Sequence, residues 1–434
     1  MKNVFVLALD EFNRMELGSI RGADGCRFLG LLDHEDVRHP EQGALDFDAL
    51  LAQAEAQLDQ AGVAVDAIIA FRDFPTSALG GVLRNRRLLP GPTNEAIAKC
   101  EHKFWSRLEQ RAVVPDLIPD FCAVDPFADD PAGMIGLDFP CWIKPIKAHS
   151  SHLGFKIRNA ADLRAHLPEI RAKIGRFGHP FDQYLRHVDV PDAVRAVGGN
   201  WCIAESLISA GHQCTLEGYV SGGEVVVYGV VDSIREGRHR SCFARYQYPS
   251  QIPRRVQARM IQGAASVMRH FGYDAAPFNM EFFWNKRSDE IRLLEVNSRL
   301  SKSHCPLFRM VDGASHQEVA VDLGLGRRPD FPHREGQFRV AGKFMIRVFE
   351  DGIVHGLPSA AEAERVVASF PEARLRMLAD EGMRLAHMHN QDSYSFELGE
   401  VFVGAESQPE LLRKYARVMQ MLTFDVEPSR PEAA

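Results

Sequence analysis

Short apolar runs alternate with an amphipathic segment over residues 1–95. The apolar runs predict three strands: Val4–Leu9, Phe28–Leu32 and Ala67–Phe71. Between the second and third of these, Leu45–Ala61 has the apolar spacing of a helix. Strands that alternate with helices favour a parallel sheet. We therefore expect an N-terminal α/β domain over residues 1–92, ending at the breaker cluster Leu88–Pro92.

The rest of the chain predicts hairpins, long helices and a smaller closing module. Further strands are expected at Phe139–Ile146, Phe155–Ile157, Trp201–Ile208, Gln213–Val220, Val225–Val231, Phe278–Trp284 and Ile291–Val296. Helices are expected at Thr93–Arg111, with Thr93 as N-cap, at Pro253–Phe271 and at Gln408–Leu422. We predict a second domain over 93–325 and an α+β module over 326–434 that holds two or three strands and at least one helix. The fold class is thus multidomain α/β and α+β.

Composition narrows the class of protein only slightly. The chain has 434 residues, 45% of them apolar and 25% charged, as in a soluble globular protein. Its net charge of -7 argues against a general nucleic-acid binder. We see no apolar stretch long enough for a membrane span and no secretory signal. The eight cysteines are scattered without a metal-type spacing, which favours reduced thiols and a cytoplasmic location. No glycine occurs in the turn after the first strand, which disfavours a nicotinamide dinucleotide.

The segment RLLEVNSRLSKSH, residues 292–304, contains three polar residues at a spacing of two: Glu295, Asn297 and Arg299. They follow an apolar run that predicts a strand. Because side chains alternate along a strand, the three share one face. This regular placement needs a physical reason.

The neighbouring strand supplies a second carboxylate. If Lys286–Glu290 form a five-residue loop, Asn285 pairs with Ile291 and Glu281 lies directly opposite Glu295. Cross-strand Cβ atoms in such pairs are about 5 Å apart, and like charges there are destabilising unless they are neutralised. Two carboxylates and the Asn297 amide are oxygen ligands that suit Mg²⁺, which usually completes its shell with substrate phosphates. The alternative is a solvated hairpin face on which the two glutamates pair with arginines.

Three other segments fit phosphate or nucleotide binding, and each has a plainer alternative. Lys144 lies within an apolar strand, where a lysine is costly unless it is paired or meets an anion; it is otherwise an edge residue that reaches solvent. The loop Lys147–Gly154 has hydroxyl groups and a glycine that suit phosphate, or it is an ordinary polar turn. Glu205 and the strand end at Ile208 suit an adenine edge, or form a plain core strand.

The order of these features resembles the ATP-grasp superfamily of ligases. The features that carry the resemblance are Lys103 on a helix, Lys144 before the Ser/Gly loop, Glu205 ahead of a hinge, Glu281, and the Glu-x-Asn-x-Arg run 295–299. The likeness covers about residues 90–320. It implies an ATP-grasp domain over 93–325 with a mobile lid at about 138–205, between an N-terminal α/β domain and a closing C-terminal module.

The resemblance also implies roles for individual residues. Nucleotide contacts are implied for Lys103, Lys144, Ser150, Ser151, Gly154, Glu205, Ser206, Ile208 and, at the ribose, Gln213. Binding of two Mg²⁺ ions, with Mn²⁺ as a substitute, is implied for Glu281, Glu295 and Asn297, and stabilisation of the transferred phosphoryl group for Arg299. Candidate substrate contacts are Lys302, His304 and Arg347, the last because it matches an arginine on a C-terminal strand of biotin carboxylases.

By resemblance the expected reaction is ligation. A small carboxylic acid, with an amino acid as one candidate, attacks ATP to give an acyl phosphate and ADP, and an amine then displaces phosphate. Biotin carboxylases carry a glutamate where this chain has Ser303, and their lid has a glycine run that 148–154 lacks. Both departures favour a carboxylate–amine ligase over a biotin-carboxylase-like enzyme. The other alternative is a non-catalytic nucleotide-binding protein, against which the presence of Glu281, Glu295, Asn297 and Arg299 argues. A homodimer is the expected assembly.

Overall fold

The computed structural model describes residues 1–38, 45–148, 152–208, 211–235, 242–388 and 395–428. They form two compact units. The first unit comprises Met1–Gly229, Ile252–Lys302 and His316–Phe331, and the second comprises Val230–Gln251, Ser303–Ser315 and Pro332–Ala434. The domain boundaries expected after residues 92 and 325 remain predictions.

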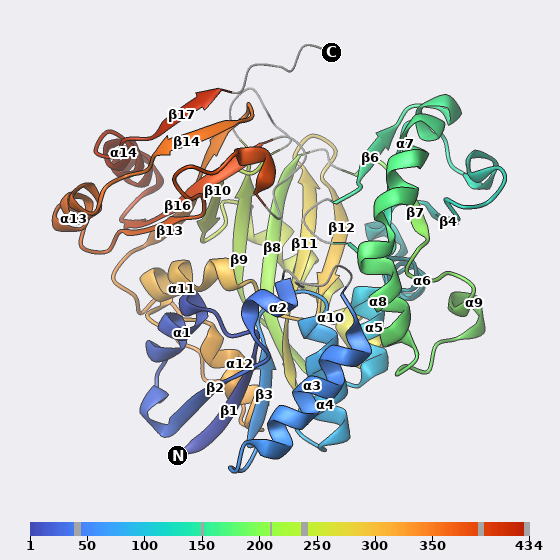
Figure 1. Ribbon diagram of the computed structural model, residues 1–434, viewed down its shortest axis with the longest axis horizontal. Coiled ribbons are helices and arrows are strands. Elements are labelled where there is room, and N and C mark those ends of the chain that lie inside the picture. Colours follow the sequence, from blue (N-terminus) through green and yellow to red (C-terminus); the bar gives the residue numbers. More distant parts are fainter. Residues whose placement is uncertain (39–44, 149–151, 209–210, 236–241, 389–394, 429–434) are drawn as a thin grey trace. The chain divides into compact units, whose positions relative to one another are not determined.

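The N-terminal part of the first unit contains the predicted parallel sheet (Figure 1). Its strands β1 (Lys2–Leu7), β2 (Cys26–Leu31) and β3 (Ala67–Ala70) pair in parallel in the order β2-β1-β3. The helices of this part are α1 (Glu11–Gly18), α2 (His34–Arg38), α3 (Phe47–Gln60) and α4 (Thr76–Arg86), with a 3₁₀ turn at Ala23–Gly25. The helix expected from Leu45 begins at Phe47, because the Asp46 side chain accepts the Ala49 N–H as its N-cap.

The helix expected over Thr93–Arg111 is interrupted, so that prediction is wrong in part. Thr93 does cap α5 (Asn94–Glu101), but His102 then takes an extended conformation and caps α6 (Lys103–Val113). The imidazole supplies the acceptor that a new helix start needs, which hydrophobic periodicity does not reveal. Lys103 is consequently the first residue of α6 rather than a mid-helix residue.

A four-stranded antiparallel sheet follows in the order β4-β7-β5-β6. Its strands are β4 (Phe121–Val124), β5 (Cys141–Pro145), β6 (Phe155–Ile157) and β7 (Cys202–Ser206). The accompanying helices are α7 (Ala160–Lys173), α8 (Gly175–Leu185) and α9 (Asp192–Arg195), with 3₁₀ turns at Pro115–Leu117 and Pro131–Met134. Ile143, Ile157 and Leu163 are fully buried in its core, so α7 packs on the sheet.

The first unit also contains the strand order β12-β11-β8-β9, in which the predicted acidic hairpin lies. The strands are β8 (His212–Ser221), β9 (Glu224–Ile234), β11 (Ala276–Asn285) and β12 (Glu290–Asn297). Cys214 on β8 contacts Met260 of α10 (Arg254–Phe271), which places α10 on one face. In the same unit α12 (Gln317–Gly324) packs against β11. At Val230, β9 continues into the second unit.

The second unit has the strand order β9-β10-β13-β16-β15 and a separate pair, β14-β17. Its elements are β10 (Arg245–Tyr248), β13 (Val340–Val348), β14 (Gly352–Gly356), β15 (Arg374–Met377), β16 (Phe396–Ala405), β17 (Asp425–Pro428), α11 (Cys305–Asp312), α13 (Ala360–Ser369), α14 (Gln408–Met419) and 3₁₀ turns at Lys302–His304 and Leu385–His387. The predicted final helix is confirmed as α14. The described residues after 338 contain β13 to β17, more strands than the two or three expected.

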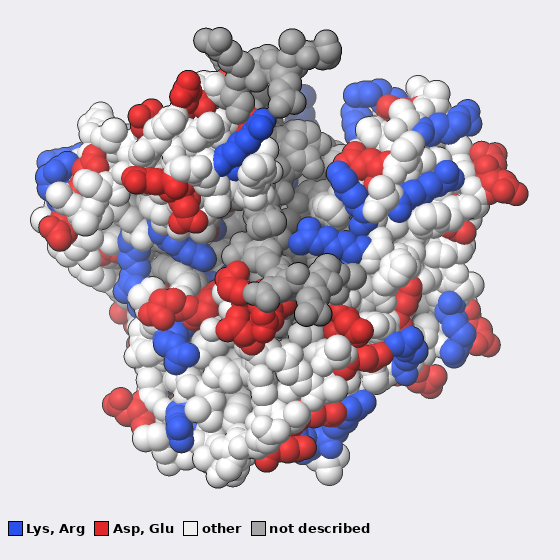
Figure 2. Space-filling view, in the orientation of Figure 1, with Lys and Arg blue, Asp and Glu red and all other residues white. Residues whose placement is uncertain are grey.

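The surface carries both signs of charge. Lys and Arg side chains are interspersed with Asp and Glu over the face drawn in Figure 2, which accords with the modest net charge of -7. Among the described residues, none of the helices has the length and apolarity that crossing a membrane requires.

Candidate functional site

The acidic hairpin has the predicted facing of Glu281 and Glu295, although it arises differently from the expectation, and a second facing pair that was not predicted. Glu281 pairs with Glu295, and Asn279 with Asn297. The turn, however, is one residue shorter than expected, so Asn285 pairs with Glu290 and not with Ile291. A β-bulge between Glu281 and Phe282 in the register then shifts the pairing by one residue. The bulge brings the second carboxylate back onto the face of the first.

The extra residue of this bulge is Leu294, and an arginine from α6 binds its backbone. Arg107 donates from Nη2 to the Leu294 carbonyl at 2.8 Å and from Nη1 to the Leu293 carbonyl at 3.0 Å. Its Nε also donates to Glu205 Oε1 at 2.6 Å. One buried guanidinium therefore joins α6, β7 and β12, the three elements that carry Lys103, Glu205 and Glu295.

Two of the predicted lysines converge on the same region. Lys103 Nζ lies 3.1 Å from Glu295 Oε1 and donates to the Ala148 carbonyl at 2.9 Å. Lys144 Nζ lies 2.7 Å from Glu205 Oε2. All four charged side chains line a small cavity of about 10 Å³, room for about one water molecule. Lys144 is thus paired inside the fold and is not an edge lysine in solvent.

The charges in this region are only partly balanced. Burial, and after it the charge of Glu295, raise the pKa of Glu281 to about 7. Burial opposes ionisation of Glu205 as well, but the charges of Arg107 and Lys144 overcome it and lower its pKa to about 2. The hairpin therefore holds a carboxylate whose negative charge its protein neighbours do not fully compensate. A divalent cation would supply that compensation.

The donor set fits Mg²⁺ through two carboxylates and an amide. Asn297 donates through its Nδ2 to Asn279 Oδ1 at 2.8 Å, which leaves the amide oxygen as its ligand atom. Within the described part of the chain, no group of three or more His, Cys, Asp or Glu side chains is arranged to hold a metal. A two-carboxylate set suits a magnesium ion that takes its remaining ligands from water and phosphate.

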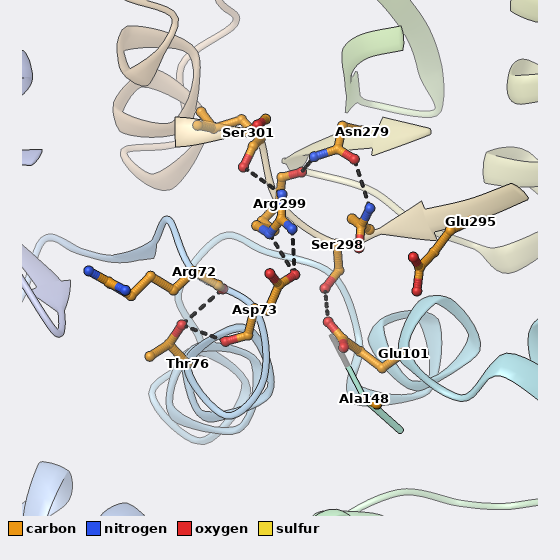
Figure 3. Close-up of polar contacts among 12 residues, drawn as sticks. Arg72, Asp73, Thr76, Glu101, Ala148, Asn279, Glu295, Ser298, Arg299 and Ser301 are labelled. Carbon is orange, nitrogen blue, oxygen red and sulfur yellow. Dashed lines mark hydrogen bonds and ion pairs between the residues drawn. The ribbon is translucent and has the colours of Figure 1, made fainter. Parts of the chain in front are cut away.

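Arg299 extends the site towards the N-terminal sheet. Figure 3 shows its guanidinium turned towards Asp73, with Nε 2.8 Å and Nη2 2.5 Å from Asp73 Oδ1. The preceding residue, Ser298, donates its hydroxyl to Glu101 Oε1 at 2.8 Å. Glu101 also pairs with Lys147 at the start of the predicted lid loop. The end of β12 is thereby joined to the segment before α4, to α5 and, through Glu101, to Lys147 after β5.

Lys302 lies at the carboxyl end of β1. Its Nζ is 3.3 Å from Asp10 Oδ2, the same oxygen that receives Arg72 Nη2 at 2.5 Å. Asp10 also caps α1 by accepting the Asn13 N–H. Carboxyl ends of parallel strands are common ligand sites in α/β sheets. This polar group is a candidate substrate region, and a substrate contact by Lys302 stays a prediction.

The remaining predicted nucleotide residues are partly described. Ser206 ends β7, and its N–H donates to the Asp120 carbonyl. Ile208 follows two residues later, and Gly154 precedes β6. Gln213, expected at a ribose, donates instead from Nε2 to Glu281 Oε2 at 2.8 Å. Ser150 and Ser151 lie outside the described residues.

Two candidate substrate residues belong to the second unit. His304 is 2% exposed and packs edge-on against Tyr246, which favours a packing role. Arg347 donates to the Phe243 carbonyl, to Ser395 Oγ and to Glu397 Oε2, each at 2.9 Å. Within that unit Arg347 is therefore held in a fixed position.

Sequence reasoning missed three polar residues around the site. Arg107 is one helical turn after Lys103, and its spacing of four was an available signal. Asp73 follows β3, where the rule for carboxyl ends of parallel strands would have identified it. Glu217, fully buried beside Asn279, gave no signal beyond its place in an apolar strand.

Comparisons with known proteins concern the fold of the chain. Residues 222–329 match the family model described as carbamoyl-phosphate synthase L chain, ATP binding domain. No curated protein sequence matches significantly. An L-amino acid ligase from Bacillus licheniformis has a similar structure, with a TM-score of 0.73, 16% identity and 98% of each chain covered.

Two further solved structures are also similar. Biotin carboxylase from Campylobacter jejuni has a TM-score of 0.64 at 14% identity, over 98% of this chain and 92% of that one. N5-carboxyaminoimidazole ribonucleotide synthetase from Thermotoga maritima has a TM-score of 0.64 at 15% identity, over 98% of this chain and 100% of the other. The chain has the ATP-grasp fold that these enzymes share.

Proposed function

We propose that the protein is an ATP-dependent ligase, which activates a small carboxylic acid as an acyl phosphate and joins it to an amine, releasing ADP and phosphate. The observation that carries the proposal is the pairing of Glu281 with Glu295 on a face that Lys103 also reaches. Two facing carboxylates bordered by a lysine form a site for a magnesium-bound polyphosphate. The ATP-grasp fold and the similarity to an L-amino acid ligase support this choice.

Each polar residue has a distinct task in this proposal. ATP supplies the phosphoryl group, and two Mg²⁺ ions held by Glu281, Glu295 and Asn297 would neutralise its charge. Lys103 and Lys144 bind phosphate oxygens and orient the triphosphate, and Glu205 fixes Lys144. Little covalent chemistry is required of the protein, since phosphoryl transfer depends on positioning and charge stabilisation.

Arg299 and its surroundings bind the acid. The guanidinium already binds a carboxylate in this structure, that of Asp73. A substrate carboxylate, and later the acyl phosphate, would accept hydrogen bonds from the same donors. In this structure the Asp73 carboxylate occupies the position that we assign to that anion. Lys302 provides a second positive charge beside Asp10.

Ligation is favoured over carboxylation by the residue at position 303. Ser303 stands where biotin carboxylases have a glutamate, and a serine hydroxyl is too weak a base to take that role at neutral pH. The similarity to biotin carboxylase in structure concerns the fold, which both reactions share.

Measuring ADP release tests the proposal. The protein is incubated with MgATP and a panel of amino acids and other small acids, paired with amines, and both ADP and the amide product are quantified. We expect ADP release that needs both substrates, loss of that release in Glu295→Ala, and retention in Glu290→Ala, an exposed glutamate of the same strand. Mn²⁺ should replace Mg²⁺, and EDTA should abolish turnover.

Two results would contradict the proposal. Bicarbonate-dependent ADP formation with biotin, and none with amines, would identify a carboxylase. Nucleotide binding without turnover over the whole panel would identify a non-catalytic protein. Light scattering of the same sample tests the homodimer that the resemblance implies.

A further inference from the structure

Glu217 is a buried carboxylate that the proposed reaction does not use. It lies on β8 with 0% of its surface exposed, directly opposite Asn279. Asn279 in turn lies opposite the candidate magnesium ligand Asn297. Directly paired residues share a face of the sheet, so Glu217 is on the face of the magnesium site.

Glu217 binds the backbone just after Arg299. The Ser301 N–H donates to both carboxylate oxygens of Glu217, at 3.3 Å each. The carbonyl of the same serine is bound as well, by His316 Nε2 at 3.0 Å. Both backbone groups of Ser301 are therefore held by side chains that are 0% exposed.

The contact with the Ser301 carbonyl fixes the hydrogen on one ring nitrogen of His316. A carbonyl can only accept, so Nε2 carries a hydrogen and donates to Ser301. The other ring nitrogen, Nδ1, is 3.0 Å from the Tyr228 hydroxyl and 3.9 Å from Glu217 Oε2. In the neutral ring Nδ1 accepts from the tyrosine, which orients the imidazole towards the loop.

A third side chain, that of Asn279, adds a hydrogen bond to this loop on the side of the magnesium site. Asn279 donates from Nδ2 to the Arg299 carbonyl at 3.2 Å, while its Oδ1 accepts from Asn297. The backbone from the Arg299 carbonyl to the Ser301 carbonyl is thus bound from β8, β11 and the start of α12. The guanidinium itself is bound at its far end by Asp73 (Figure 3).

A carboxylate at this position is costly, which calls for a reason. Burial raises the pKa of Glu217 to about 7, and an apolar residue of similar size would avoid the desolvation penalty. An apolar residue would however remove this acceptor from the part-buried Ser301 N–H. The requirement to fix Ser301 accounts for Glu217.

We propose that Glu217 is a positioning residue that, together with His316, holds Ser301 and thereby places Arg299 for phosphoryl transfer. This inference rests on the proposed function, because it assigns to Arg299 a role in turnover. Glu217 touches neither substrate nor metal in this account. It acts through the backbone of the loop 298–301.

The test measures kcat and the Kd for MgADP separately in variants of Glu217. In Glu217→Leu the loop loses its acceptor while the carboxylates of the hairpin remain, so we expect kcat to fall by about 100-fold, the scale of a 1 Å misplacement. The Kd for MgADP should stay at the wild-type value. Glu217→Gln keeps an oxygen that accepts the Ser301 N–H, and should restore kcat.

A matched control removes another buried carboxylate. Glu16 on α1 is 1% exposed and lies outside the proposed site, so Glu16→Leu should keep the wild-type kcat. If Glu217→Leu does not fold, His316→Leu takes its place, because it removes the other side-chain contact to Ser301. It should show the same fall in kcat at unchanged Kd.

Amide hydrogen exchange at Ser301 provides a readout that needs no turnover. We expect faster exchange in Glu217→Leu than in wild type and Glu217→Gln. If the wild-type protein releases no ADP with any substrate pair, the proposed function fails. Slow exchange of the Ser301 amide that depends on Glu217 would still support the hydrogen bond between them. The inference would be overturned if Glu217→Leu left the Ser301 exchange rate or kcat unchanged. It would also be overturned if Glu217→Leu and Glu217→Gln lowered kcat equally.

Discussion

At the scale of single residues, His102 combines a structural role with a predictable pH dependence. Its ring is 0% exposed, accepts the Trp105 N–H through Nδ1 and binds the Val197 carbonyl through Nε2 at 2.8 Å. A carbonyl accepts only, so the ring is neutral with its hydrogen on Nε2. Protonation of Nδ1 would place two donors against each other, and burial lowers the pKa of His102 from 6.5 to about 4.

The sign of the resulting pH effect follows from linkage. Between pH 6.5 and about 4 the unfolded chain binds a proton on His102 that the folded protein does not, so stability falls as the pH falls through this window. We expect His102 to lower the free energy of unfolding by about 2 kcal/mol when the pH falls from roughly 7.5 to 5. Urea unfolding of wild type and His102→Asn, which keeps an N-cap, measures the difference. If wild type and His102→Asn lost the same free energy of unfolding over this pH range, the pH effect would not come from His102.

Glu205 gives a second prediction at this scale. Its two oxygens bind Arg107 and Lys144 in a buried environment, so Glu205→Gln leaves two cations without their counter-charge. We expect a loss of about 3 kcal/mol in the free energy of unfolding, the scale for breaking a buried pair. Glu169→Gln removes a half-exposed partner of Lys173 and should cost about 0.5 kcal/mol or less. Similar losses in the two variants would show that burial of the Glu205 pairs is energetically unimportant.

At the scale of secondary-structure elements, the bulge in β12 connects the hairpin to helix α6. Arg107 binds the Leu293 and Leu294 carbonyls as well as Glu205. Arg107→Met removes all of these contacts and frees α6, β7 and β12 to shift relative to one another. We expect MgADP to bind at least about 10-fold more weakly, a loss of about 1.4 kcal/mol.

The control for this prediction lies on the next turn of the same helix. Arg111 is exposed and stacks on Phe121, so Arg111→Met should keep the wild-type Kd for MgADP in isothermal titration calorimetry. Equal affinities in Arg107→Met and wild type would show that the bulge does not depend on this guanidinium.

The same element shows how far the sequence predicts the site. The period of two in Glu295, Asn297 and Arg299 and a turn between two apolar runs were enough to predict the facing of Glu281 and Glu295. The bulge was not predictable, because the arginine that binds it is 186 residues away from Leu293 in the chain. The error of one residue in the turn was compensated by the bulge, since only one register buries the apolar face.

Contacts made across long sequence separations explain the other omissions. Arg299 was predicted from its own strand, but its partner Asp73 is 226 residues away and comes from the N-terminal sheet. Local patterns similarly predicted the strands β1 and β3, because parallel buried strands are continuous apolar runs. The edge strand β2 was predicted from its apolar residues Phe28, Leu29 and Leu31, although of these only Leu31 is buried. They failed at His102, where a side-chain cap divides one apparent helix into two.

At the scale of the whole molecule, ligand binding should protect one unit more than the other. Lys103, Lys144, Glu281, Glu295 and Asn297 all belong to the first unit. MgADP at about 100 times its Kd should stabilise the binding-competent fold by about 2.7 kcal/mol. We therefore expect slower amide exchange in α6, β5, β7, β11 and β12, and a smaller change in β14, α13 and β17 of the second unit.

Hydrogen exchange with mass spectrometry, with and without MgADP, checks this distribution. Glu295→Ala should lose most of the protection because the nucleotide then lacks a ligand for its magnesium, whereas Glu290→Ala on the same strand should keep it. Protection confined to the second unit, or equal protection in both variants, would contradict a nucleotide site built on the hairpin. Because exchange reports binding without turnover, the measurement locates the nucleotide whichever acid and amine the enzyme joins.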